Sequence, residues 1–281
     1  MIPRSGEFAD QERITYRGGV SYSYAIAQGL SVGAGASYSR NYYDDPDRED
    51  THSQDYSIST RVARDSGIRI FSDRTSATAS VGYSRGDRIA GNSGFQSGTD
   101  RVTGRLGIET RLRRDLRHSF TFSRALREGF NSDFEGYDNY RYTIDWDGPP
   151  DVSASAFAGL SRVSPTLEKE SDYRNWSAGV VVTYPLLSFA TFTFSSTYTL
   201  RDNRQRDLAE AAAEAADEEE LEAEDVNDYE TWANRVSTGF RITRQTTFTT
   251  SYSHIERYSD SEVLEYERDV FAALLTYSHQ F

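Results

Sequence analysis

Arginine is the residue type in this sequence whose spacing most clearly suggests a chemical role. Four arginines lie about nine to eleven residues before a predicted short turn, namely Arg17, Arg61, Arg105 and Arg235. If strands that line a pore carry them, this spacing places their guanidinium groups at comparable heights. Rings of arginine make a channel favour anions. The sequence therefore predicts a basic constriction that selects anionic solutes or acidic sugar chains. The alternative is that these arginines pair with acids and brace the wall.

Other charged residues share this phase of the chain, and two of them are acids that offer local counter-charges. The full set of candidate pore-lining residues is Arg17, Arg61, Arg101, Arg105, Glu109, Arg111, Arg141, Asp145, Arg235 and Arg241. The remaining residues of this phase are mostly Ser, Thr and Gly, as at Ser57, Ser59, Thr78 and Ser80. Such small side chains would not fill a barrel of about 14 strands, so a water-filled channel is expected.

The elements that must position these residues are predicted from a period of two. Apolar and aromatic residues alternate with small polar ones over residues 14–26 and 30–42, and the pattern recurs to the C-terminus. It repeats about every 40 residues, which fits one hairpin of an outer-membrane barrel. The predicted fold class is an all-β, antiparallel up-and-down transmembrane β-barrel over residues 10–281. A propeller has a similar repeat but needs four strands within it.

The strand count comes from the turns and loops between the alternating segments. Short turns are predicted near residues 27–29, 72–75, 113–115, 147–151, 185–188 and 244–246, and long loops near residues 44–53, 86–99, 128–138, 163–173, 201–228 and 259–265. Short turns then face the periplasm and long loops the outside. About thirteen strands are visible, and because bacterial barrels have even numbers we expect about 14 or more in the intact barrel. Residues 1–9 would hold a truncated strand or a loop.

Composition excludes two classes of protein. The mean hydropathy is −0.69, and no run approaches the roughly 18 apolar residues of a membrane helix, so a helical membrane protein is excluded. The net charge is −13, and residues 207–230 contain twelve acids and no base. Nucleic acid is therefore not an expected partner. This acidic stretch falls in the predicted extracellular loop 201–228, where we expect a solvated segment; a gate or a divalent-cation site is the alternative.

The last predicted strand carries a more specific pattern. Aromatic or apolar residues occupy every second place and the chain ends on Phe281, with Phe271, Leu275, Tyr277 and Phe281 as the candidate assembly signal. This pattern resembles the signature that the barrel-assembly machinery of Gram-negative bacteria recognises. The resemblance implies a place in the bacterial outer membrane, with its lipid and lipopolysaccharide and the assembly machinery as partners.

A second resemblance spans most of the chain. Predicted strands end on an aromatic residue, Ser and Arg, as at residues 38–40 and 83–85, and an Asp-rich loop follows at residues 42–48. These features resemble β-barrel porins associated with exopolysaccharide export. The resemblance implies a channel with a role in polysaccharide export and an export partner in the periplasm. No signal peptide is visible after Met1, so we expect a mature chain or a fragment.

Two other functions are carried as alternatives to a channel: a closed barrel that acts as a scaffold or adhesin, and an outer-membrane hydrolase. The four histidines are His52, His118, His254 and His279. His254 lies beside Ser251 and Ser253 in sequence, but neighbours on a strand point to opposite faces. We interpret His254 as an interfacial residue that ends its strand. No catalytic, cofactor-binding or metal-ligating residue is assigned, no cofactor is expected, and we do not expect an enzyme.

Overall fold

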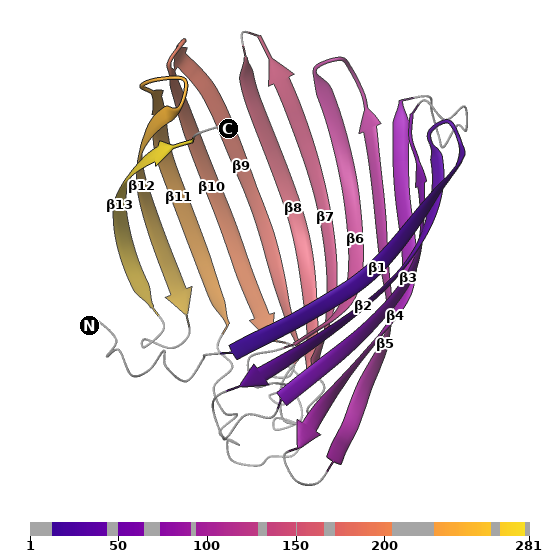
Figure 1. The fold of residues 1–281 in the computed structure, drawn as a ribbon. Helices are drawn as coiled ribbons and strands as arrows, with labels where there is room; N and C mark the ends of the chain where they lie inside the picture. Colours follow the sequence, from indigo (N-terminus) through magenta and orange to yellow (C-terminus); the bar gives the residue numbers. More distant parts are fainter. Residues whose placement is uncertain are drawn as a thin grey trace, which may run out of the picture. The chain divides into compact units, whose positions relative to one another are not determined.

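The described residues form one antiparallel sheet of thirteen strands. The computed structural model describes residues 13–43, 50–64, 74–90, 94–128, 134–149, 151–165, 172–203, 228–259 and 265–278. Each strand is hydrogen-bonded to the next one along the chain (Figure 1). The strands are β1 (Arg13–Ala27), β2 (Leu30–Tyr43), β3 (Asp50–Val62), β4 (Thr75–Ala90), β5 (Gly94–Arg111), β6 (Leu116–Glu128), β7 (Phe134–Gly148), β8 (Val152–Pro165), β9 (Tyr173–Leu187), β10 (Ala190–Asn203), β11 (Tyr229–Arg241), β12 (Thr246–Ser259) and β13 (Tyr266–Tyr277). The predicted all-β, up-and-down fold class is confirmed, with 13 strands.

The chain divides into two compact parts. The first part comprises Met1–Glu109, Thr121–Asn139 and Arg162–Asp172, and the second comprises Thr110–Phe120, Tyr140–Ser161 and Tyr173–Phe281. The first part contains β1 to β4, and the second contains β9 to β13, which run side by side from orange to yellow in Figure 1. The register of these strands shows how the alternating sequence sorts side chains onto two faces.

In the first part, apolar and polar rows alternate across the strands. One row of paired residues consists of Tyr22, Ala34, Ile58 and Val81. The next row consists of Ser23, Gly33, Ser59 and Ser80. Successive residues on a strand point to opposite faces, so one face is aliphatic and aromatic while the other is lined by small polar groups. We call these the outer face and the inner face.

The second part repeats the arrangement. An outer row consists of Val182, Phe194, Val236, Tyr252 and Phe271, and the adjacent inner row consists of Thr183, Thr193, Ser237, Ser251 and Ala272. Aromatic rings pack across the strands on the outer face. The ring centroids of Tyr198 and Trp232 lie 5.0 Å apart, and those of Tyr252 and Phe271 lie 4.7 Å apart. Such aromatic pairs stabilise adjacent antiparallel strands.

Burial is inverted relative to a water-soluble domain. Val20 is 78% exposed and Phe271 is 80% exposed, although both belong to the apolar rows. Among the described residues, the buried hydrophobic side chains are Val62, Phe134, Val163 and Ala190. Soluble monomers rarely expose contiguous apolar surface of this extent. The described residues contain no helix of the length and apolarity required to cross a membrane.

Five of the six predicted short turns lie where described strands end, whereas the connection between β3 and β4 is longer than predicted and the long loops were overestimated. Gly29 closes the first hairpin with a φ of 69°, and Asp151 has a φ of 62° between β7 and β8. The predicted loop at residues 86–99 is too long, because β4 continues to Ala90 and β5 begins at Gly94. The polar residues of this segment led to its interpretation as a loop. β5 nevertheless extends over 18 residues.

A close approach between strands makes Gly82 a sensitive position in the first part. A Cβ atom there would press against the backbone oxygen of Tyr56 and lie 2.7 Å from Thr103 Oγ1. Backbone atoms cannot yield as a side chain can, so Gly82→Ala is expected to lower the free energy of unfolding by about 1–3 kcal/mol. Urea titration of the folded protein in detergent measures this. Gly18→Ala is the matched control, because nothing lies within 4 Å of its added Cβ; an equal loss in both variants would contradict the steric explanation.

Candidate permeation surface

The inner face of the first part is hollowed around Arg17. A cavity of about 730 Å³ is lined by Thr15, Arg17, Ser37, Ser39, Asn41, Thr51, His52, Ser53, Asp55, Leu126, Arg127 and Phe134. Hydrogen bonds run across its floor: the Thr15 hydroxyl donates to Asn41 Oδ1 at 2.7 Å, and the Ser39 and Ser53 hydroxyls lie 2.8 Å apart. Asp55 accepts from Ser37 at 3.2 Å and also from Ser84. The cavity is therefore polar and contains both signs of charge.

A second hollow on this inner face brings two predicted arginines together. Arg61 and Arg105 line a cavity of about 390 Å³ whose other lining residues are Ser23, Ser31, Val32, Gly33, Ser59, Thr60, Thr78, Ala79 and Ser80. None of these residues is acidic. Within the described part of the chain, neither guanidinium makes a hydrogen bond or an ion pair. The alternative in which these two arginines pair with acids and brace the wall therefore finds no support among the described residues.

The register corrects the prediction that Arg17 and Arg61 lie at one height. Arg17 pairs with Ser39 on β2, and Ser39 pairs with Ser53 on β3. Arg61 lies eight residues further along β3, which is about 27 Å at ~3.4 Å per residue. The prediction failed because it measured each arginine from its nearest turn. Strand β3 ends at Val62 and strand β4 begins at Thr75. The connection between them is therefore longer than the turn between β1 and β2.

Three other predicted residues are paired with opposite charges. Arg101 donates from NH2 to Asp138 Oδ1 at 2.9 Å, and Glu109 accepts from Arg64. Asp145 Oδ2 lies 3.8 Å from Arg117 Nε. Arg111 is exposed at the end of β5. For Arg101, Glu109 and Asp145 the bracing interpretation fits better than a free charge in a pore.

In the second part, two of the three predicted arginines have neutral partners. Arg235 donates from NH2 to Ser251 Oγ at 3.3 Å on the inner face, and its strand neighbours are Ser195 and Ser253. The Arg141 guanidinium lies 3.9 Å from the centroid of the Phe157 ring. Arg241 is exposed at the end of β11. Arg235 therefore lies among Ser side chains of the two neighbouring strands.

The assembly signal is described only in part. Phe271, Leu275 and Tyr277 alternate on the outer face of β13 and are 80%, 63% and 63% exposed. Phe281 and His279 lie outside the described residues, as do residues 1–9 and the acidic stretch 204–227 of the predicted extracellular loop. The roles of these segments stay predictions.

Two features of the inner and buried surface were missed from sequence. Asp55 shares its phase with Ser57 and Ser59, so a stricter reading of the alternation could have placed it on the inner face. Asp138 is 8% exposed and accepts from both Arg101 and Arg124. In sequence, Arg101 and Arg124 are separated from Asp138 by 37 and 14 positions, respectively. No local pattern in the sequence predicts this cluster.

Comparison with known proteins gives likeness of structure only. No protein-family model matches this sequence, and no curated protein matches it either. The structure is similar to OmpTΔL8, a loop L8 deletion mutant of the outer membrane protein OmpT of Vibrio cholerae, with a TM-score of 0.48, 8% identity, and coverage of 94% of this chain and 95% of that chain. It is also similar to the anion-selective porin from Comamonas acidovorans, with a TM-score of 0.40, 10% identity, and coverage of 86% and 78%. Likenesses at these scores carry no weight for what this chain does.

Proposed function

We propose that this chain is a channel of the bacterial outer membrane, a porin, that passes hydrophilic and preferentially anionic solutes over its inner face. The observation that supports this most directly is the opposite character of the two faces. The outer rows are apolar and exposed, as at Val20 and Phe271, and apolar side chains exposed in this way are stable against lipid. The inner rows carry Ser, Thr and Gly, which leave room for water.

The preference for anions is proposed from Arg61 and Arg105. Both guanidinium groups line one polar hollow without an acidic neighbour among its lining residues. Positive charge that is not neutralised attracts anions and repels cations. Arg235 adds a further positive charge on the inner face of the second part.

Acidic sugar chains are a finer form of the same proposal. Rows of Ser and Thr hydroxyls offer both donors and acceptors to sugar hydroxyls, and arginine offers paired donors to carboxylates. Transport of a polymer would also require a periplasmic partner that delivers it. No chemical step is part of this proposal, and no residue is assigned a catalytic role.

Planar-bilayer recording tests the proposal. Folded protein added to a bilayer is expected to produce discrete open-channel steps. In a KCl gradient, the reversal potential is expected to lie closer to the equilibrium potential of chloride than to that of potassium. The unfolded protein at the same concentration is the control for contaminating channels. Sustained silence of folded protein would favour a closed scaffold, and a cation preference would overturn the anion assignment. Block of the current by an acidic but not by a neutral polysaccharide would support the finer proposal, and equal behaviour would reject it.

A further inference from the structure

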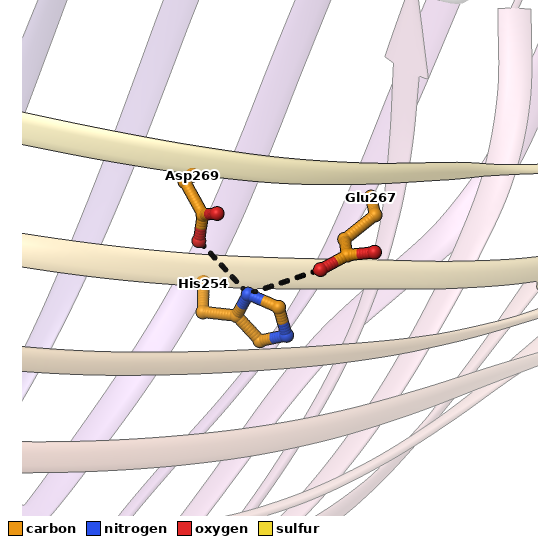
Figure 2. A group of neighbouring side chains, drawn as sticks. All are labelled: His254, Glu267 and Asp269. Carbon is orange, nitrogen blue, oxygen red and sulfur yellow. Dashed lines mark hydrogen bonds and ion pairs between the residues drawn. The ribbon is translucent and has the colours of Figure 1, made fainter.

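One side-chain cluster lies apart from the inner face and is not used by the proposed channel. His254 on β12 pairs in register with Asp269 on β13, and Glu256 pairs with Glu267. These residues share the outer face with Tyr252 and Phe271, on the side away from Arg235. Both acidic side chains of β13 point towards the His254 ring (Figure 2). The interpretation of His254 as the end of its strand is wrong, because β12 continues to Ser259.

The three side chains present ligand atoms at short separations. His254 Nδ1 lies 2.9 Å from Asp269 Oδ1 and 4.0 Å from Glu267 Oε1. One ligand atom from each of these residues lies within 4.8 Å of the other two. Ligands of a tetrahedral Zn²⁺ lie about 3.4 Å from one another, given bond lengths near 2.0–2.2 Å. Glu267 is exposed at the protein surface, so its side chain can close the longer gap by rotation.

The other ring nitrogen of His254 is held in a way that favours metal binding. Nε2 lies 2.7 Å from Glu256 Oε1. An ionised carboxylate can only accept, so without metal both ring nitrogens donate, Nε2 to Glu256 and Nδ1 to Asp269. Zn²⁺ would displace the proton on Nδ1, while the Nε2–H contact with Glu256 is kept and fixes the ring. Tyrosine hydroxyls orient the acids further: Tyr252 donates to Asp269 at 2.7 Å, and Tyr258 donates to Glu256 at 2.8 Å. Metal-ligating histidines are commonly oriented by a carboxylate on their second nitrogen.

We propose that His254, Glu267 and Asp269 form a Zn²⁺ site that joins β12 to β13. One imidazole and two carboxylates suit zinc and neighbouring transition metals. Calcium instead prefers six to eight oxygen ligands, and the imidazole is a poor substitute for one. Water completes the coordination. The proposal does not depend on the channel, because the cluster lies on the opposite face from the inner rows.

The test is calorimetric titration of the folded full-length protein in detergent with zinc chloride. One Zn²⁺ is expected to bind per chain and to raise the midpoint of urea unfolding. His254→Gln is expected to weaken binding at least tenfold and to abolish the shift of the midpoint. Glu256→Ala, which removes the group that orients the ring, is expected to weaken binding about 10–100-fold while leaving the three ligands in place.

His118→Gln is the matched control for these variants. His118 lies on β6, outside the cluster, and contacts the Tyr142 hydroxyl at 3.1 Å, so its substitution is expected to leave zinc binding unchanged. The proposal is overturned if the folded protein shows no saturable uptake, or if His118→Gln loses as much affinity as His254→Gln. Calcium binding that equals zinc binding and survives His254→Gln would likewise overturn it, in favour of a general acidic surface. Unchanged conductance in His254→Gln would separate this result from any test of the channel.

Discussion

Reversing the charge of Arg61 and Arg105 is expected to convert an anion-preferring channel into a cation-preferring one. Both guanidinium groups line the same hollow, and its lining contains no acid. In a water-like dielectric, one unit of charge about 6 Å from a passing ion contributes about 0.7 kcal/mol. Arg→Glu changes the charge by two units, or about 1.4 kcal/mol for a passing ion, so each substitution is expected to lower the permeability of anions about tenfold and to raise that of cations by a similar factor.

The reversal potential in a KCl gradient measures this effect for Arg61→Glu, Arg105→Glu and the double variant. Recording near 0.1 M salt keeps the screening length at about 10 Å, and the shift should shrink as the salt concentration rises. Arg40→Glu is the control. Its guanidinium lies 4.3 Å from the Tyr42 ring centroid on the outer face, so the same change of charge there should leave selectivity unaltered. If the double variant keeps its anion preference, the permeation path does not pass these residues.

Asp138→Ala is expected to give the largest loss of stability among single substitutions in the first part. Asp138 is 8% exposed. Its carboxylate accepts from Arg124 Nε at 2.9 Å and NH2 at 2.7 Å, and from Arg101 NH2 at 2.9 Å. Removing it leaves two guanidinium groups without their shared acid. Loss of one partner from a buried ion pair costs about 3–5 kcal/mol, and because the Arg124 side chain is 45% exposed we expect about 2–3 kcal/mol.

Urea unfolding of the protein in detergent provides the measurement, with Asp145→Asn as the control. Asp145 lies 3.8 Å from Arg117, and both side chains are about a third or more exposed, so its loss should cost under about 1 kcal/mol. An equal loss of unfolding free energy in the two variants would mean that the Arg101–Asp138–Arg124 cluster stabilises the protein no more than an exposed ion pair does.

Strand identity could be predicted from sequence because it depends on neighbours two residues apart. The alternation from Ile14 to Ile26 already separates the exposed apolar face from the Ser-rich one, and Gly29 marks the turn. The position of Arg61 and Arg105 on the inner face follows from the same phase. These successes need no knowledge of contacts between distant residues.

Register and clusters could not be predicted, because they are properties of strand pairs. The height of Arg17 relative to Arg61 depends on how β1, β2 and β3 are offset. Asp138 contacts Arg101, which lies 37 positions away in sequence, and His254 contacts Asp269, which lies 15 positions away. Residues 86–90 and 94–99 were mistaken for a loop because polar residues and glycines in succession hide the period of two by which a strand is recognised.

The small size of the side chains in the inner rows affects how such a protein can change during evolution. Where Ser and Thr face the interior, as in the row of Thr183, Thr193, Ser237 and Ser251, a larger or charged side chain enters open space and disturbs no packed core. The outer rows need only remain apolar. In the proposed channel, single substitutions in the inner rows can therefore change the width and the charge of the path while the outer rows and the strand pairing are retained, so related proteins can diverge in the solutes they pass without a change of fold.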